Sequence, residues 1–310
     1  MIQNKTKTIR RSFSKFIRHP ECYPLQLQRR DLQILHLVYD YRFIASDQIK
    51  GLIPGSERKK LERLQKLFHH SYLERLADRR IRLRAGSDKM VYAITNKAAE
   101  LLTDELGVPV GKVNWAWKNR STTERHIKHT LMIGRLRTAM SMAAEKGSEV
   151  QLAFWKENRG IGQNIDPELS DAVMIPVGEK GKERARIVPD AFLALDIGKS
   201  QQYFYLEADR STMTNDRFLK KLKAYWTWWK QGGSQRKHGV KNFRVLTITR
   251  SYERRDNLRR IAAAASPNAG GSGMFWFACE KDYSVAVPES IWGNIWVTAK
   301  SQERTSLIEP

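Results

Sequence analysis

The chain has 310 residues, and its 55 Lys and Arg against 33 Asp and Glu give a formal net charge of +22. Hydrophobic residues make up 41% of it, which is enough to build two domains with their own cores. The positive charge is spread along the sequence and predicts a polyanionic partner, of which nucleic acid is the commonest. Two cysteines exclude a disulfide framework and a Cys-based zinc site. No apolar run approaches the ~20 residues of a membrane span, so we expect a cytoplasmic protein without membrane contacts.

Composition and turn signals divide the chain into four parts. The predicted parts are a basic flexible arm at 1–27, a DNA-binding domain at 28–110, a Gly- and Pro-containing linker at 111–120 and a second domain at 121–310. The arm either lies on phosphate or is simply a disordered end. The sequence leaves the role of the C-terminal segment 251–310 open.

The first domain begins with three helical patterns. Apolar spacing predicts a helix from Arg30, a short one capped by Ser46 and a third capped by Ser56. The third helix has an apolar stripe formed by Leu61, Leu64, Leu67 and Phe68. Its other face carries five basic residues, Arg58, Lys59, Lys60, Arg63 and Lys66.

A hairpin pattern follows these helices. Residues 72–95 alternate apolar and polar side chains around the turn signal AGSD, and a last helix starts at Asn96. The hairpin carries four arginines, Arg79, Arg80, Arg82 and Arg84. This order is typical of a winged helix-turn-helix, with the third helix in the major groove of duplex DNA and the arginines against its backbone. The alternative is a winged helix used for protein contacts, whose basic residues are a solvated face. We expect His69 and His70 to be surface residues at a helix end.

The second domain shows the element order α-β-β-β-α-β. The predicted elements are a helix at 121–147, a strand at 149–158, a polar excursion at 161–184, strands at 185–197 and 201–209, a helix at 215–230 and a strand at 242–250. This is the core order of the PD-(D/E)XK restriction-endonuclease-like fold. We therefore expect an α+β protein of two domains.

Three acids fall on the two central strands of this pattern. Asp190 follows Pro189, and the period of two along the next strand puts Glu207 and Asp209 on one face. Converging carboxylates raise one another's pKa unless a divalent cation neutralises them, and oxygen ligands favour Mg²⁺ or Mn²⁺. Such an ion would activate water for phosphodiester cleavage.

The lysine of the nuclease pattern is missing from its usual place, where Asp209 stands instead. Lys221 borders the apolar stripe of the following helix and is the best-placed substitute, while Lys220 lies opposite that stripe. Lys221 at a helix edge with its ammonium in water is the competing interpretation. Arg210 is a second candidate, but only if the strand ends or bulges near Asp209.

Several short motifs together resemble the replication-relaxation family of plasmids and other bacterial mobile elements. They are RHIKHTLMI, VPDAFLAL, YLEADRST and KLKAY, within a resemblance that covers most of residues 28–250. The family's strand signature, an acid, any residue, Asp, a basic residue and Thr, is matched at Glu207, Asp209, Arg210 and Thr212, with Ser211 where Gly is more usual. His129 matches the family's helical histidine and would belong to the site; the alternative is a satisfied core histidine. Glu124 is a weaker candidate for the first acid of the nuclease pattern.

The resemblance implies DNA processing or replication control for a mobile element, with the protein associated with plasmid or nucleoid DNA in a bacterial cytoplasm. Two functions stay open. One is a metal-dependent endonuclease or nickase, favoured by Asp190, Glu207 and Lys221. The other is a non-catalytic replication or transcription regulator that uses a degenerate nuclease fold for dimerisation or DNA clamping, favoured by Asp209 in the lysine position. Double-stranded DNA is the expected partner, and a homodimer or contacts with replication or transfer proteins of the element stay open.

Overall fold

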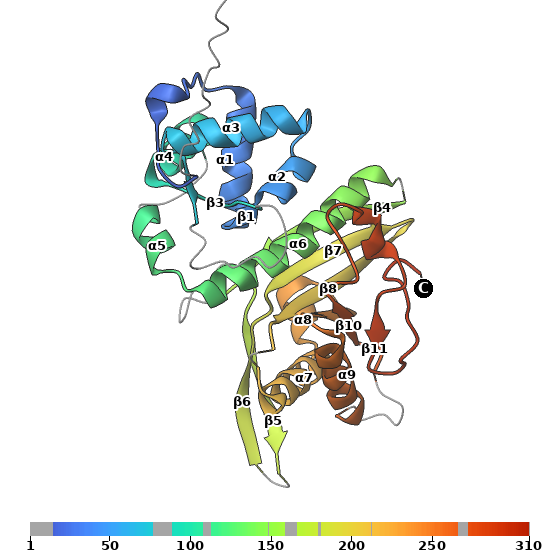
Figure 1. The fold of residues 1–310 in the computed structure, drawn as a ribbon. Coiled ribbons are helices and arrows are strands. Elements are labelled where there is room, and N and C mark those ends of the chain that lie inside the picture. The colour runs from blue at the N-terminus through green and yellow to red at the C-terminus, as the bar shows by residue number, and fades with distance from the viewer. Residues whose placement is uncertain are drawn as a thin grey trace, which may run out of the picture. The chain divides into compact units, whose positions relative to one another are not determined.

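The protein is described here by a computed structural model (Figure 1). It describes residues 15–76, 89–107, 113–147, 149–158, 166–178, 181–211, 213–265 and 272–309. Contacts divide the chain into two compact units, unit 1 (Met1–Lys128) and unit 2 (His129–Pro310). This division falls inside helix α6 (Glu124–Lys146), downstream of the segment 111–120 that the sequence predicted as a linker. Helix α5 (Trp115–Ser121) begins within that segment and packs into unit 1 through the buried Trp115.

Unit 1 is a helical body with a small antiparallel sheet. Its elements are η1 (Pro20–Cys22), α1 (Arg29–Tyr41), β1 (Ile44–Ala45), α2 (Ser46–Leu52), α3 (Glu57–His69), β2 (Leu73–Arg75), β3 (Val91–Ile94), α4 (Asn96–Leu106) and α5. The strand order is β1-β3-β2. Leu64 and Leu67 of α3 are fully buried in its core, as the apolar stripe predicted. Leu61 is 44% exposed, so its place in that stripe was wrong: a helix this short buries only the part of the stripe that meets a neighbour.

The described part of the N-terminal arm packs on α3. Arg18 donates hydrogen bonds to the backbone oxygens of Phe68 (3.0 Å) and Leu73 (3.3 Å). The ring of Tyr23 stacks on His69 with centroids 4.0 Å apart, and His69 is only 3% exposed. The prediction that His69 lies at the surface was therefore wrong. Periodicity along one helix cannot show that a distant segment covers its end.

Unit 2 is built on a six-stranded mixed sheet. The main sheet and a separate β5–β6 pair contain the strands of unit 2, which are β4 (Val150–Glu157), β5 (Asp171–Val177), β6 (Gly181–Ile187), β7 (Ala191–Ile197), β8 (Ser200–Asp209), β9 (Arg244–Thr249), β10 (Phe275–Cys279) and β11 (Val297–Thr298). Its helices after α6 are α7 (Asn215–Lys230), α8 (Gly233–His238), α9 (Tyr252–Ala264) and η2 (Pro288–Trp292). The main sheet has the order β11-β10-β9-β8-β7-β4, in which β4, β7 and β8 are antiparallel neighbours and β8, β9 and β10 are parallel.

Two apolar layers cover this sheet. Alternate residues point to opposite faces, so Leu193 and Leu206 meet α6 and the C-terminal segment, while Phe192 and Tyr205 meet the side of α7 and α9. Figure 1 shows α6 running along one face, with α7 and α9 on the other. Among the described residues, no helix is long and apolar enough to cross a membrane.

The segment before the sheet's second strand differs from the sequence prediction. The polar excursion 161–184 contains β5 and most of β6, which pair as a separate two-stranded sheet, and the predicted strand 185–197 is two strands, β6 and β7. The break falls at Val188 to Asp190, because Pro189 has no backbone N–H to continue the pairing. This break places Asp190 directly before β7.

Candidate functional site

Asp190 and Glu207 occupy neighbouring positions on adjacent strands. Ala191 of β7 is paired with Leu206 of β8, and one step earlier the Asp190 N–H donates to the Leu206 oxygen at 2.8 Å. The antiparallel register therefore sets Asp190 beside Glu207. The two acids predicted from the strand pattern are brought together at one end of the β7–β8 pair.

Asp190 is held by α6 and by the backbone of β8. Its Oδ1 lies 3.0 Å from Nε2 of His129, and its Oδ2 accepts a hydrogen bond from the Ala208 N–H at 2.7 Å. Burial by itself would raise the pKa of Asp190, but the charge and hydrogen bond of His129, with Lys221 and the Ala208 N–H, hold that pKa below its usual value. Burial would lower the pKa of His129, yet the Asp190 carboxylate outweighs it and raises that pKa. The pair thus favours a charged histidine beside a charged carboxylate.

Glu207 is held by two donors from α7. Lys221 pairs with its Oε2, and the Tyr225 hydroxyl donates to its Oε1 at 2.6 Å. Glu207 is 5% exposed, and burial raises its pKa to about 7 despite the opposing charge of Lys221. Carboxyl groups with strongly perturbed pKa values are common at functional sites and also occur in structural ion-pair networks.

Lys221 lies where the helix stripe predicted. Its ammonium reaches the Glu207 carboxylate from the sheet-facing side of α7. The neighbouring Lys220 points elsewhere and pairs with Glu183 of β6 at 2.6 Å. The competing interpretation, an ammonium surrounded by water, does not describe Lys221.

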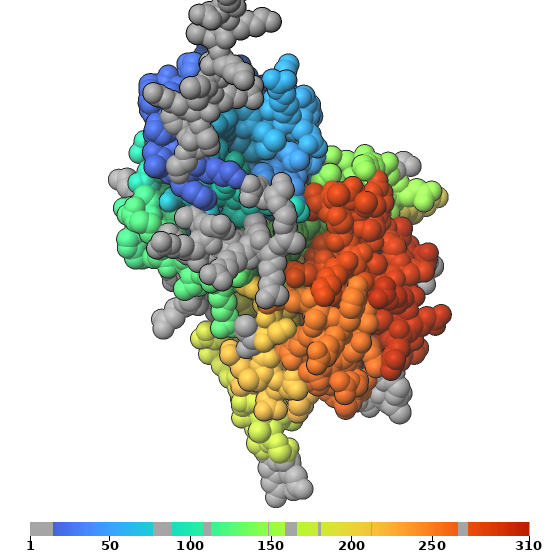
Figure 2. All heavy atoms as spheres, viewed as in Figure 1, coloured from blue at the N-terminus to red at the C-terminus, as the bar shows by residue number. Residues whose placement is uncertain are grey.

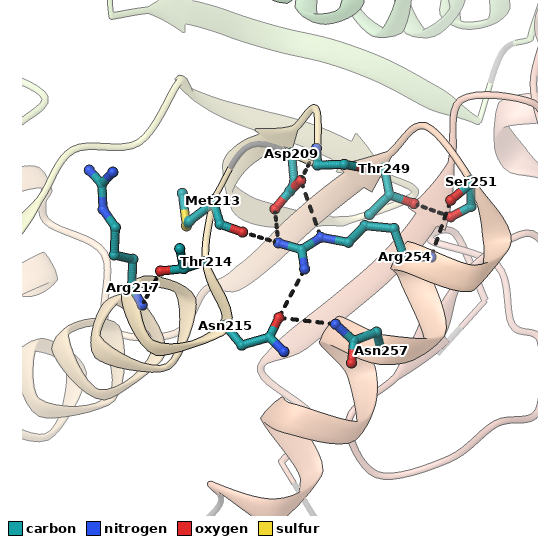
Figure 3. A network of polar contacts seen from close by, with 10 residues as sticks. Asp209, Met213, Thr214, Asn215, Arg217, Thr249, Ser251, Arg254 and Asn257 are labelled. Carbon is teal, nitrogen blue, oxygen red and sulfur yellow. Dashed lines mark hydrogen bonds and ion pairs between the residues drawn. The ribbon is translucent and has the colours of Figure 1, made fainter.

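Asp209 is engaged by an arginine that the sequence pattern did not indicate. Its Oδ2 lies 2.9 Å from Nη2 of Arg254 on α9, and the same guanidinium donates to the Met213 oxygen at 2.6 Å and to Asn215 Oδ1 at 2.9 Å (Figure 3). The Ser211 N–H also donates to Asp209. Asp209 is 5% exposed, so its charge is balanced inside the protein by Arg254. It organises the turn between β8 and α7.

Two further charged candidates have other neighbours. Arg210 directly follows the end of β8, and its positive charge opposes the rise that burial causes in the pKa of Glu280. Glu124, on the part of α6 that belongs to unit 1, pairs with Lys128 one turn along the helix.

A three-acid metal cluster is not assembled. Within the described residues, no three His, Cys, Asp or Glu side chains gather so that they could hold a metal ion. The physical reason is the pairing of Asp209 with Arg254. Asp190 and Glu207 remain together, and Mg²⁺ in proteins is commonly held by one or two carboxylates while it keeps several waters. Each carboxylate oxygen retains a lone pair beyond the hydrogen bond it accepts, so this donor set fits such an ion.

The predicted DNA-contacting face of α3 is smaller than the sequence suggested. Lys60 is 4% exposed, and its ammonium donates to the backbone oxygens of Ile53 (2.8 Å) and Lys50. Arg63 is 8% exposed and forms a two-point ion pair with the fully buried Asp31. Both were predicted to contact DNA and instead tie α3 to the preceding turn and to α1. Helical spacing cannot distinguish a basic residue in solvent from one that a buried acceptor neutralises.

Two of the five basic residues predicted on α3 are exposed to solvent. Arg58 and Lys59 are exposed, and Lys66 is half-buried and pairs with Glu62 at 3.1 Å. The four arginines predicted in the wing, Arg79, Arg80, Arg82 and Arg84, lie outside the described residues. The flanking strands β2 and β3 pair antiparallel, as a hairpin requires.

Comparison with known proteins identifies the family. A model of the replication-relaxation family matches residues 35–243. The chain belongs to the replication-relaxation family. Membership indicates a role in replication or in DNA processing by mobile elements. No curated protein and no solved structure matches the chain.

The region matched to the replication-relaxation family includes His129, Asp190, Glu207 and Lys221. Sequence reasoning overlooked two further members of the polar network. Tyr225 is four residues after Lys221, so helical geometry places both on one face, and this spacing was a usable signal. Arg254 lies beyond the matched region, and no local pattern connects it to Asp209.

Proposed function

We propose that this replication-relaxation protein binds duplex DNA and cuts one or both of its strands as a metal-dependent endonuclease or nickase. The observation that carries the proposal is the contact of Lys221 with Glu207 beside Asp190. Two acids and one lysine are the functional groups of PD-(D/E)XK nucleases, and here the lysine comes from α7 instead of the strand. The proposed place of action is the DNA of a mobile element in a bacterial cytoplasm.

The element order supports both domain assignments. In unit 2 the order α6, β4, β7, β8, α7, β9, with three antiparallel strands and a parallel fourth, is that of the PD-(D/E)XK core, into which the β5–β6 hairpin is inserted. In unit 1 the order helix, strand, two helices and a strand pair is that of a winged helix, in which α3 is the recognition helix. We propose these folds on that basis.

The chemistry assigns a task to each side chain. Asp190 and Glu207 would hold Mg²⁺ or Mn²⁺, which supplies Lewis-acid activation of a phosphodiester when bound. The Lys221 ammonium, oriented by Glu207, stabilises negative charge that develops on the phosphate oxygens. His129 orients Asp190 through its 3.0 Å contact.

A second candidate is a DNA-binding regulator without nuclease activity. It is favoured by the Arg254 ion pair of Asp209 and by the four oxygens of Asp190 and Glu207, each of which already accepts from a protein group. A site whose charges are balanced by side chains can be purely structural. The nuclease proposal gives the buried Glu207 a chemical role that the regulator does not require.

Nicking of supercoiled plasmid with Mg²⁺ and with Mn²⁺ tests the proposal. We expect the wild-type protein to nick, Lys221→Ala to lose nicking while it binds DNA as before, and Lys220→Ala to retain nicking. Lys220 is the matched control because it removes the same charge from the same helix, away from the acids. Calorimetry should show divalent-ion binding that Asp190→Asn loses. A wild-type protein that binds duplex DNA and nicks with neither metal would establish the regulator.

A further inference from the structure

The β5–β6 hairpin is a two-sided ribbon attached to unit 2. Its strands pair from Asp171 opposite Ile187 to Val177 opposite Gly181. One face is apolar and packs on α7 through four buried side chains, Val173, Ile175, Ala185 and Ile187. Figure 1 shows the pair extending beyond the main sheet, and Figure 2 shows it as a narrow yellow-green projection. The ribbon is therefore anchored on one side and open to solvent on the other.

The open face carries a row of positive charge. Lys182, Arg184 and Arg186 are all exposed and occupy alternate positions of β6, so their side chains leave the same face. Opposite them on β5 stand the neutral Pro176, Met174 and Ala172.

The acids of the hairpin do not neutralise this row. Asp171 accepts from Trp228 at 2.7 Å and Glu183 pairs with Lys220, and both partners belong to α7 on the anchored side. In the described part of the chain, Lys182, Arg184 and Arg186 form no ion pair. Uncompensated charges at regular spacing attract a regular polyanion.

The spacing and position of the row point to one kind of ligand. Alternate residues of a strand are about 7 Å apart, so the row spans about 14 Å. Duplex DNA carries one negative charge per about 1.7 Å of its axis, and its major groove admits a two-stranded ribbon. Only Val188 and Pro189 separate β6 from Asp190. DNA held by the β5–β6 hairpin would lie next to the short segment that leads from β6 to Asp190.

We infer that the outward face of the β5–β6 hairpin binds the backbone of duplex DNA through Lys182, Arg184 and Arg186, and so delivers the phosphodiester to Asp190 and Glu207. The inference rests on the proposed function and adds a DNA contact in unit 2 that is separate from α3. It also gives the hairpin inserted before β7 a purpose beyond covering α7.

The test compares two triple variants of the full chain by fluorescence anisotropy with a duplex across a range of salt. The first is Lys182→Gln, Arg184→Gln, Arg186→Gln. The matched control is Lys199→Gln, Lys230→Gln, Lys241→Gln, which removes three exposed charges from the β7–β8 turn, the end of α7 and the segment before β9, at the end of unit 2 away from Asp190. Each phosphate contact contributes about 0.9 to the slope of log affinity against log salt, so the ribbon variant should lose about 2.7 from that slope and at least about tenfold in affinity at low salt.

The outcomes separate the two proposals. We expect the control to keep the wild-type slope. A charge-conserving variant, Lys182→Arg, Arg184→Lys, Arg186→Lys, should bind like the wild type, because it keeps all three positive charges. A ribbon variant that stays folded by circular dichroism and keeps the wild-type slope would overturn the inference while leaving DNA binding by the protein intact. Equal losses in ribbon variant and control would also overturn it, since the effect would then be one of net charge. A wild-type chain that binds no duplex would overturn the proposed function itself.

Discussion

Replacing Glu207 by Gln should abolish a loss of stability that unit 2 undergoes as the pH rises from about 5 to about 8. Burial raises the pKa of Glu207 from 4.5 to about 7. A carboxyl group with a raised pKa in the folded state binds its proton more tightly there than in the unfolded chain. Its contribution to stability is therefore lost as the pH rises from the unfolded pKa to the folded one. The Gln variant cannot ionise and escapes this loss.

The magnitude follows from the shift. One pKa unit corresponds to about 1.36 kcal/mol, so ionisation of Glu207 should cost the wild-type protein about 2–3 kcal/mol of unfolding free energy between about pH 5 and about pH 8. Groups remote from Glu207 are present in both proteins and cancel in the difference, whereas His129, whose pKa the Glu207 charge helps to raise, should have a lower pKa in the variant. The expected result is that Glu207→Gln gains about 2–3 kcal/mol on the wild type over this interval.

Urea unfolding followed by circular dichroism at the two pH values measures this difference. Glu183→Gln is the matched control, since it removes a half-exposed carboxylate that also pairs with a lysine of α7. Its difference from the wild type should be the same at both pH values. The reasoning fails if Glu207→Gln behaves like this control, because Glu207 would then be ionised at little cost and would carry no sign of a functional site.

Four further substitutions test the packing of charged and small residues. Arg63→Ala leaves a buried carboxylate unpaired and should cost about 3–5 kcal/mol in urea unfolding, whereas Lys59→Ala should change stability by less than about 0.5 kcal/mol and weaken duplex binding in a gel-shift titration. Arg254→Ala should cost a similar 3–5 kcal/mol, because Asp209 loses its buried partner; unchanged stability would show that Asp209 is free to bind a cation. Gly233→Ala would place a methyl group against the indole ring of Trp228 on α7. It should therefore lower the melting temperature by several degrees in a thermal scan.

Much of unit 2's site could be predicted because strand and helix geometry is local. The period of two placed Glu207 and Asp209 on one face of β8, and both do face the α7–α9 side. The stripe on α7 placed Lys221 toward the sheet, where it contacts Glu207. These predictions needed only the direction in which successive side chains leave an element.

Predictions failed where a partner distant in sequence decides the state of a charge. Lys60 and Arg63 follow the same helical spacing as the exposed Arg58 and Lys59. Their burial depends on acceptors supplied by the α2 turn and by Asp31 of α1. The metal-ligand role predicted for Asp209 likewise conflicts with the ion pair that Asp209 forms with Arg254 of α9.

The sequence by itself determined the strong positive charge, most of the order of elements and the faces on which Glu207 and Lys221 lie, because each follows from composition or from the repeat of a helix or strand. Tertiary structure alone decided which charged side chains are neutralised by partners inside the protein and which stay exposed to solvent. The physical reason is that a buried charge needs a partner within a few ångströms, and the fold, not sequence proximity, selects that partner. The same selection leaves Lys182, Arg184 and Arg186 exposed on the hairpin that leads to Asp190.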